Sequence, residues 1–459
     1  MRDSIGDKKE QSEEIVNQIK KLSESVEAYS SDITGIKEAD EGLTKDNQRW
    51  VEELTENRGR SLFYPYIGSG VGRGVYVEVQ DGSVKMDLIN GIGINIMGHS
   101  HPEIIQATVQ GALSDVVMQG NLQPGKEMVR LSKKLVELAS KKSRLKHSWL
   151  TTSGSMANEN ALKMCRQKTN GARKVVAMKA AFAGRTTLMA EITDNPSMRE
   201  GLPEYDDVLR VNFYDKDNPS SSQESLDQLK EHIKNHRGDI CCFMFEPMQG
   251  EGGYNVAPKE FFVPLFELCK SEGIPILNDE IQTFCRTGEF FAYERIGIGE
   301  YIDVCTVAKT LQGAATLYTD ELNPKPGLIA GTFAGSAAAM SAGLKVIEIL
   351  ERDGFIGESG KIRKIEEKFI GMLNQLNETT CKGLLQDACG MGTMLAVNPL
   401  DGSADKRNKL LSVLYKNGLI AFGCGKGPFK IRFLIPAVMT DQDIEVAKEI
   451  IEKSVLELA

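Results

Sequence analysis

Two short apolar runs in the second half of the chain each lead to residues that could do chemistry. Residues 274–277 precede the acidic pair Asp279-Glu280, and residues 302–308 precede Lys309. Short apolar runs are typical of buried strands in a parallel sheet, and ligands bind beyond the carboxyl ends of such strands. A lysine and a carboxylate at one rim could serve pyridoxal phosphate, which forms a Schiff base with a lysine and pairs its pyridinium nitrogen with an acid. By spacing alone, however, most strand-end residues of these types are solvated surface groups.

The sequence around these residues alternates between expected strands and helices. Apolar runs at residues 175–178 and 241–245 predict two more buried strands, and residues 258–272 predict a helix that follows them. This alternation predicts an α/β chain with a mostly parallel central sheet. We expect residues 96–336 to form this large, cofactor-binding domain and residues 337–459 to form a smaller C-terminal α+β domain.

The first 95 residues are expected to add two further parts. Residues 61–95 are interpreted as a β-hairpin that belongs to the small domain, with Asp81-Gly82 as its turn. Residues 1–60 form a polar, acidic and helical N-terminal extension, in which we expect one or two surface helices packed on the body of the protein or on a partner subunit. The apolar residues that repeat at helical spacing in this extension are Ile15, Ile19, Leu22, Val26, Trp50, Val51 and Leu54.

Composition and charge argue against several classes of function. The chain has 459 residues and a formal charge of −9, which argues against a nucleic-acid surface. The sequence contains no run of 18 apolar residues, so no membrane span is expected. The N-terminal sequence is too charged for a secretory signal, and we expect a cytoplasmic protein. The nine cysteines include no CxxC pair and are interpreted as reduced thiols. No cysteine or acid at ligand spacing accompanies His99 and His101, so no metal is expected, and His99 could instead cap the helix expected after it.

The residues around Asp279 belong to a longer motif. The sequence NDEIQTFCRTGEFFAYE at residues 278–294 resembles the DE-Q-T-x-x-x-R-T-G stretch of class III, pyridoxal-phosphate-dependent aminotransferases. This is the family of acetylornithine, ornithine and 4-aminobutyrate aminotransferases. Further motifs in the family's order extend the likeness over residues 67–445. The resemblance implies the fold type I architecture of the aspartate aminotransferase superfamily, pyridoxal phosphate as cofactor, and a homodimer with its active sites at the subunit interface.

A cluster of small polar residues at 151–155 opens an expected helix. Free N–H groups and the helix dipole at such an N-terminus favour a phosphate, although an ordinary Ser/Thr cap has the same sequence pattern. The cluster resembles the family's S-G-[AS]-E-A-N-E loop, which implies that Gly154 and Ser155 bind the cofactor phosphate, with Met156 in place of the usual Glu. The sequence GTFAG is similar to the family's G-T-F-x-G, which implies that Thr332 donates to the phosphate of the neighbouring subunit's cofactor. A turn or helix cap is the other explanation for Thr332.

The resemblance also implies roles around the cofactor ring. Lys309 would hold the cofactor as a Schiff base and, once freed, move a proton as general base and then as general acid. Asp279 would keep the pyridine nitrogen protonated, and Gln282 would bond the ring hydroxyl. Phe182 stands in a stretch similar to the family's aromatic-H-G-R-T motif and would stack on the ring, with plain core packing as the alternative.

Three charged residues are implied in substrate binding. Arg185 belongs to the same stretch, in which Ala183 replaces the usual His, and its guanidinium would bind a substrate carboxylate. A surface charge is the other explanation for Arg185. Glu251 lies in EPMQGEGG, and in ornithine-type members this residue pairs with a late arginine, here Arg432, to switch the site between substrates. The resemblance therefore predicts transfer from an ω-amino donor, such as N-acetylornithine, ornithine or 4-aminobutyrate, to 2-oxoglutarate, giving glutamate.

The segment after Lys309 departs from the family pattern. About four residues of the loop K-x-L-x-G-G-G-x-P-x-G-A are missing, so the wall of the pocket should differ. This difference and Met156 leave open an aminomutase or decarboxylase with the same cofactor and fold. A non-catalytic binding or scaffold protein, acting through the N-terminal helices, is a third interpretation, against which the presence of Lys309, Asp279 and Arg185 counts.

Overall fold

Asp279 and Lys309 lie at the ends of neighbouring strands of a seven-stranded sheet in the computed structural model, which describes residues 3–120 and 122–459. The strand order is β5-β13-β12-β11-β8-β6-β7. In this part of the chain all neighbours are parallel except that β13 is antiparallel to β12 and β5, which confirms a mostly parallel sheet. The strands are β5 (His147–Thr151), β6 (Lys174–Met178), β7 (Val208–Val211), β8 (Ile240–Phe245), β11 (Ile276–Asp279), β12 (Val304–Val307) and β13 (Ala314–Tyr318).

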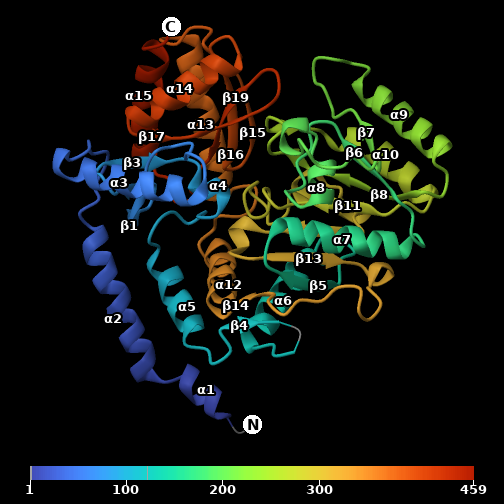
Figure 1. The fold of residues 1–459 in the computed structure, drawn as a ribbon, viewed down its shortest axis with the longest axis horizontal. Coiled ribbons are helices and arrows are strands. Elements are labelled where there is room, and N and C mark those ends of the chain that lie inside the picture. Colours follow the sequence, from blue (N-terminus) through green and yellow to red (C-terminus); the bar gives the residue numbers. More distant parts are fainter. Residues whose placement is uncertain (1–2, 121) are drawn as a thin grey trace.

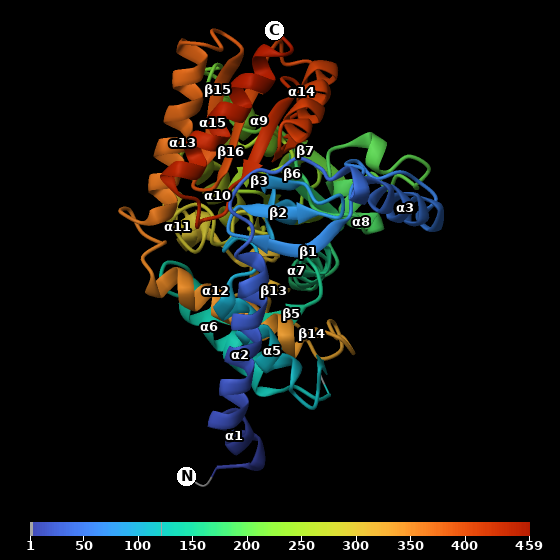
Figure 2. The ribbon, with the colours of Figure 1, turned by 90° about the vertical axis from the view of Figure 1, so that its left-hand side faces the viewer.

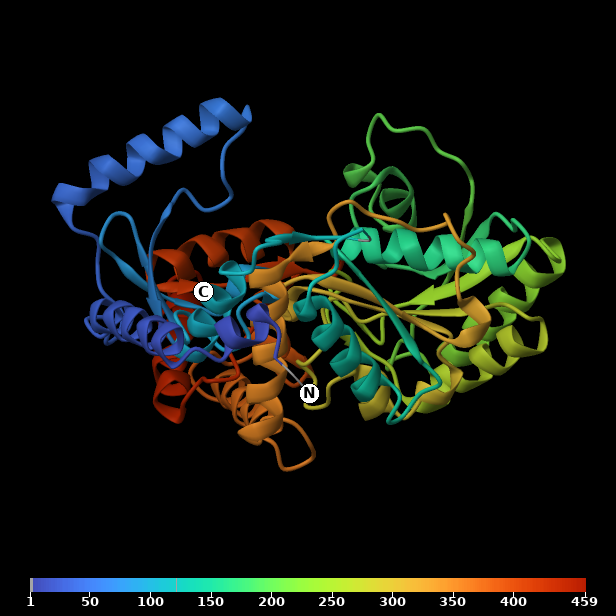
Figure 3. The ribbon, with the colours of Figure 1, turned by 90° about the horizontal axis from the view of Figure 1, so that it is seen from below.

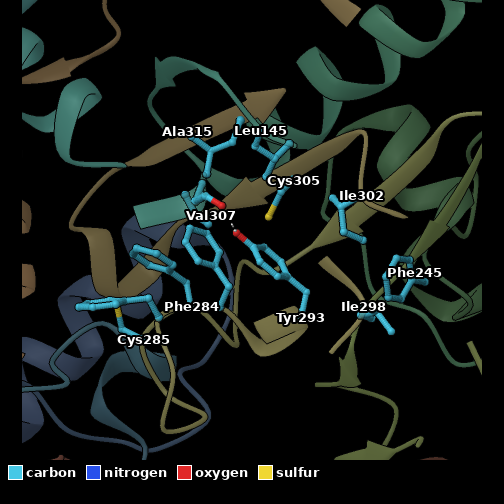
Figure 4. Packing of buried hydrophobic residues seen from close by; sticks show 14 of the residues in the cluster. Leu145, Phe245, Phe284, Cys285, Tyr293, Ile298, Ile302, Cys305, Val307 and Ala315 are labelled. Atoms are coloured by element: carbon cyan, nitrogen blue, oxygen red, sulfur yellow. Dashed lines mark hydrogen bonds between the residues drawn. The ribbon is translucent and has the colours of Figure 1, made fainter. Parts of the chain in front are cut away.

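Both faces of this sheet are buried. Successive side chains of a strand point to opposite faces, so each strand contributes to the cores on both sides. In β8, Phe243 and Phe245 belong to one hydrophobic core, whereas Cys242 and Met244 belong to the other. Figure 4 shows part of the first core, in which the rings of Phe284 and Tyr293 lie beside β12. The first core is covered by α6 (Lys126–Ala139), α9 (Ser221–Asn235), α10 (Lys259–Ser271) and α12 (Ala337–Arg352), and the second by α7 (Gly154–Lys168) and α8 (Thr187–Ile192).

A second, antiparallel sheet is built from C-terminal residues and lies at the top of Figure 1. Its strand order is β15-β16-β19-β18, and a separate core that includes Phe369 and Phe433 fills the space beneath its helices. A third sheet, β1-β2-β3-β17, combines the expected N-terminal hairpin with a parallel strand from residues 419–420. The bounds are β1 (Gly68–Arg73), β2 (Tyr76–Val79), β3 (Val84–Asp87), β15 (Leu385–Met391), β16 (Met394–Pro399), β17 (Leu419–Ile420), β18 (Phe422–Cys424), β19 (Lys430–Leu434), α13 (Lys361–Glu378), α14 (Ala404–Lys416) and α15 (Asp441–Leu456).

Short elements connect these parts. Helix α5 packs against α12 in the middle of Figure 1, and the two-residue strands β4 and β14 pair beside them. The remaining elements are α4 (Asn90–Gly93), α5 (Pro102–Ala112), α11 (Ala292–Ile296), β4 (Met118–Gln119), β9 (Met248–Gln249), β10 (Asn255–Val256), β14 (Gly335–Ser336) and the 3-10 turns η1 (Pro196–Met198), η2 (Gly299–Tyr301), η3 (Lys309–Leu311) and η4 (Asp320–Leu322).

The N-terminal extension forms three helices, where one or two were expected: α1 (Ile5–Glu10), α2 (Glu13–Ser30) and α3 (Glu41–Arg58). Figure 2 shows α2 along the outside of the molecule, where it packs on α5. Helix α1 reaches α6 through an ion pair between Asp7 and Lys126. Helix α3 stands apart in Figure 3, and Asn47 is its one residue described as buried, whereas Trp50 is 47% exposed. Of the predicted apolar stripe of α3, Trp50 and Leu54 are therefore exposed, whereas Val51 is partly buried.

His99 does not cap α5, because its Nε2 lies 3.0 Å from Oδ2 of Asp87 and the residue at the start of that helix is His101. None of the helices formed by residues 3–120 and 122–459 is long and apolar enough to span a membrane.

Candidate active site

A cavity of about 370 Å³ lies at the carboxyl ends of the parallel strands. Asp279 is the last residue of β11, and Lys309 is the first residue of η3, directly after β12 and Ala308. Because β11 and β12 are parallel neighbours, both residues reach the same edge of the sheet, and both line the cavity. Lys309 has a φ of 52°, a left-handed conformation that is uncommon for a residue with a Cβ atom. Such strain concentrates at functional sites.

The Asp279 carboxylate is held by two donors. Asn158 Nδ2 donates to Oδ2 at 2.8 Å, and the backbone N–H of Ile281 donates to Oδ1 at 2.9 Å. Asn158 is itself fixed, because it accepts a bond from the hydroxyl of Thr306 at 2.7 Å and donates to the carbonyl of Ala183 at 2.8 Å. Burial raises the pKa of Asp279 to about 6, although these hydrogen bonds and Lys309 act to lower it. The carboxylate is therefore pre-oriented and would gain strongly from a cationic partner.

Lys309 is held in a setting that favours its neutral form. Burial lowers the pKa of its ammonium group, and the nearby Arg432 lowers it further, whereas Glu251 and Asp279 act in the opposite direction. A neutral amine is the form that attacks a carbonyl carbon or accepts a proton from carbon. The position of Lys309 thus suits it to covalent chemistry and to proton transfer.

The N-terminus of α7 opens onto the same cavity. Ser153 caps the helix by accepting from the N–H of Met156 at 3.3 Å, and Gly154 and Ser155 line the cavity wall. Gly154 has no room for a side chain, because a Cβ atom there would lie 2.8 Å from Ile281. The free N–H groups of this first turn and the helix dipole make an anion site of the kind that binds phosphate.

Phe182 and Gln282 complete the wall around the strand ends. Among the described residues, Oε1 of Gln282 has no hydrogen-bond partner although it is buried. A buried polar atom without a partner is costly, so it indicates a ligand or water. Glu246 anchors this region by accepting from the N–H groups of Phe182 at 3.0 Å and Gly250 at 2.9 Å. Burial raises the pKa of Glu246 to about 8, so this carboxyl group is largely protonated at neutral pH.

Six of the ten predicted site residues line this one cavity: Gly154, Ser155, Phe182, Asp279, Gln282 and Lys309. Arg185 lies outside its lining and is exposed, with its guanidinium carbon 5.6 Å from the ring centre of Phe182. Thr332 is exposed and also outside the lining. Glu251 and Arg432 form an ion pair of 2.6 Å, with Arg432 fully buried, beside a neighbouring cavity that shares Phe182.

Two residues of this site were not assigned a role from the sequence. Asn158 orients Asp279, and Glu246 holds the backbone of Phe182. Both stand inside motifs that the sequence analysis used, in SGSMANE and EPMQGEGG respectively. The motif positions were therefore available as a signal, but the contacts that define the two roles join residues 121 and 64 positions apart.

The residues around the cavity fit pyridoxal phosphate. A lysine, a pre-oriented carboxylate, a helix N-terminus, an aromatic ring and an unpaired amide match the functional groups of that cofactor. Within residues 3–120 and 122–459 there is no group of three His, Cys, Asp or Glu side chains that could hold a metal ion.

Comparison with known protein sequences identifies relatives across most of the chain. A profile of the family Aminotransferase class-III matches residues 65–455, so helices α1, α2 and α3 lie outside the match. The chain is 30% identical to 5-aminovalerate aminotransferase DavT from Pseudomonas putida over 427 residues, covering 88% of this chain and 96% of that protein. It is 31% identical to acetylornithine aminotransferase from Methanocaldococcus jannaschii over 392 residues, covering 82% and 89%. It is 29% identical to a probable 4-aminobutyrate aminotransferase from Bacillus subtilis over 434 residues, covering 88% and 95%.

Solved structures show the same fold. A lysine aminotransferase from M. tuberculosis superimposes with a TM-score of 0.78 at 21% identity, covering 89% of this chain and 100% of that one. The ornithine aminotransferase from Toxoplasma gondii ME49 gives a TM-score of 0.77 at 21% identity, covering 91% and 97%. The expected fold type I architecture is thereby confirmed.

Proposed function

The chain belongs to the class III aminotransferase family, and from this premise we propose that it moves an amino group from an ω-amino donor to 2-oxoglutarate, with pyridoxal phosphate as cofactor. N-acetylornithine, ornithine and 4-aminobutyrate are the candidate donors, and the name of one relative adds 5-aminovalerate. One observation carries the proposal: Lys309 and Asp279, delivered by neighbouring parallel strands, line a single cavity with the N-terminus of α7. The acceptor, 2-oxoglutarate, would thereby be converted to glutamate.

Each cavity residue has a role in this proposal. Bound pyridoxal phosphate supplies an electron sink for the substrate carbon from which a proton is removed. Asp279 keeps the ring nitrogen protonated, because its carboxylate is already oriented by Asn158. Lys309 takes the proton from the substrate carbon and returns it, and burial, which lowers the pKa of its ammonium group, favours the neutral amine that accepts the proton. Gly154 and Ser155 bind the phosphate at the start of α7.

Substrate exchange requires a charged group that can change partners. The Glu251 side chain, which is 28% exposed, pairs with the buried Arg432 at 2.6 Å. While an ω-amino donor is bound, this pair keeps Arg432 neutralised. When 2-oxoglutarate enters, Glu251 swings away and Arg432 binds the carboxylate next to the keto group. The exposure of Glu251 supports the proposed movement, and the burial of Arg432 makes a replacement anion necessary.

Glu251→Ala is therefore expected to shift the preference of the enzyme toward glutamate. Without Glu251 the buried Arg432 lacks its anion. Substrates with an α-carboxylate should therefore bind more favourably, and donors without one should bind less favourably. We expect the ratio of kcat/KM for glutamate to that for 4-aminobutyrate to rise about 10-fold or more, the usual size of one charged hydrogen bond. The two half-reactions are measured separately by stopped-flow absorbance. As a control, Glu260→Ala removes an exposed acid of α10 and should leave the ratio unchanged. An unaltered ratio in Glu251→Ala would exclude the switch.

A homodimer is part of the proposal, because Thr332 does not line the cavity of its own chain. Thr332 stands beside the exposed side chain of Phe333 and next to β14, which pairs with β4 and its exposed Met118. An exposed apolar surface of this kind supports a subunit contact, across which Thr332 would bind the neighbour's cofactor phosphate. Sedimentation at twice the chain mass of 50.5 kDa is expected, and a fully active monomer would contradict the proposal.

The absorbance of the purified, cofactor-loaded protein tests the function directly. A band near ~420 nm, expected of a cofactor bound to lysine, should bleach with one ω-amino donor and recover with 2-oxoglutarate. Carbon dioxide release would identify a decarboxylase, and an isomeric product without need of 2-oxoglutarate would identify an aminomutase. The absence of a band after cofactor addition would overturn the assignment of Lys309 and Asp279.

A further inference from the structure

A second cavity of about 240 Å³ adjoins the first across the ring of Phe182, which lines both. Its walls come from the loops at residues 180–182 and 193–198 on one side and from α14 and β18 on the other. Four aromatic rings line it: Phe63, Phe182, Phe422 and Phe429. A substrate whose amine reacts at Lys309 could therefore extend past Phe182 into a space walled by apolar rings and a few charged groups.

The charged groups of this second cavity are paired, with one exception. Lys426 lies 3.2 Å from Asp194, and Glu251 lies 2.6 Å from Arg432. Arg407 also lines the cavity, but across the described residues it forms no ion pair, and its one side-chain hydrogen bond runs from Nε to Oδ1 of Asn408 at 2.8 Å. The cavity thus carries one uncompensated positive charge.

The Arg407 guanidinium is held in place by its surroundings. Its central carbon lies 5.4 Å from the ring centre of Phe429, within the range of a cation–π contact. On the other side, Gly423 of β18 leaves the space that the guanidinium occupies, because a Cβ atom at Gly423 would overlap Nη1. A half-buried guanidinium that is fixed by packing but lacks an anion is ready to bind a carboxylate, whose two oxygens match its planar fork.

We propose that Arg407 binds the carboxylate at the far end of the amino donor, so that the second cavity selects donors that carry an anionic group several carbons from the reacting amine. This inference rests on the proposed aminotransferase function and assigns the donor end of the same site. The residue expected from the sequence for such a role, Arg185, is exposed and lines neither cavity. Arg407 follows directly after Lys406 in the first turns of α14, outside every motif that carried the family resemblance.

The test compares donors with and without the carboxylate. Bleaching near ~420 nm by 5-aminovalerate and by pentylamine is measured in single turnovers for the wild type and for Arg407→Gln. We expect the half-saturating concentration of 5-aminovalerate to rise about 10- to 100-fold, as for loss of a charged hydrogen bond, with its saturating rate and the response to pentylamine unchanged. Lys406→Gln removes the neighbouring exposed cation of α14 and should behave as wild type.

Two further variants separate binding from structure. Gly423→Ala must displace the guanidinium and is expected to reproduce the Arg407→Gln defect. Arg185→Gln is measured beside it, because Arg185 is the competing candidate for the same carboxylate. Equal losses for 5-aminovalerate and pentylamine in Arg407→Gln, or a carboxylate-specific loss in Arg185→Gln alone, would overturn the assignment. Thermal unfolding of each variant confirms that the compared proteins are folded.

A binding measurement distinguishes failure of this inference from failure of the proposed function. Valerate has the carboxylate but no amine, so its binding to the full-length, cofactor-loaded protein needs no reaction. Isothermal titration should detect valerate binding in the wild type and in Lys406→Gln, but not in Arg407→Gln. If the wild type binds valerate through Arg407 yet transfers no amino group, the inference stands and the proposed function fails. If the wild type transfers amino groups and valerate binding does not depend on Arg407, the inference fails alone.

Discussion

Lys309→Ala is expected to lower the rate of amino transfer by at least about 10³-fold, because it removes both the amine that would hold the cofactor and the group that moves the proton. No other lysine lines the cavity of about 370 Å³, as far as residues 3–120 and 122–459 show, so no neighbour can replace it. Borohydride reduction of the loaded wild type should fix the cofactor covalently to the peptide that contains Lys309. The same treatment of Lys309→Ala should add no mass.

Lys179→Ala provides the matched control for this experiment. Lys179 is an exposed lysine that directly follows β6, and it lines neither the cavity with Lys309 nor the one with Arg407. Its removal should leave both the attachment and the rate unchanged. Covalent attachment at a different lysine in the wild type, or a Lys309→Ala protein with its rate intact, would refute the role given to Lys309.

Asp279→Asn is the second change with a large expected effect. The substitution keeps the size of the side chain and an oxygen for the N–H of Ile281, but it removes the negative charge that pairs with the ring nitrogen. We expect cofactor affinity to fall about 10- to 100-fold and the rate of proton removal from substrate to fall with it. Both are measured by titrating the cofactor into the apoprotein and by single-turnover kinetics.

The pH dependence of cofactor binding provides a second test of the role of Asp279. Burial raises the pKa of Asp279 to about 6, so its carboxylate is protonated, and the ion pair is lost, as pH falls below that value. Cofactor affinity of the wild type should therefore decline below about pH 6. The cofactor phosphate has its own second pKa near ~6, and Asp279→Asn reports that contribution alone. Equal pH profiles for the two proteins would show that Asp279 does not interact with the ring.

The position of Asp279 and Lys309 could be predicted because it follows from short-range rules. Two apolar runs, each ending in a polar residue, predict parallel strands, and parallel neighbours place their carboxyl ends at one edge. The resemblance added the phosphate loop at Gly154 and the residues Phe182 and Gln282, which the structure places in the same cavity.

The remaining features depend on contacts that local patterns do not encode. The bond between Asn158 and Asp279 joins residues 121 apart, and the surroundings of Arg407 are set by packing of α14 against β18. His99 looked like a helix cap because of its place in the sequence, but the carboxylate that holds it comes from Asp87 on β3. Arg185 matches a motif, yet the motif does not predict that its side chain is exposed beside the ring of Phe182.

The sheet β1-β2-β3-β17 constrains the order in which the protein is assembled in the cell. Strand β3 ends at Asp87, but its parallel partner begins at Leu419, and Leu88 donates its N–H to Ile420 while its carbonyl accepts from Leu434. At a synthesis rate of roughly 5–20 residues per second, the ribosome needs on the order of 20–70 s to make the intervening chain. During that interval the N-terminal hairpin has an unpaired edge. The sheet can therefore be completed only after the strands that carry Asp279 and Lys309 have been synthesised.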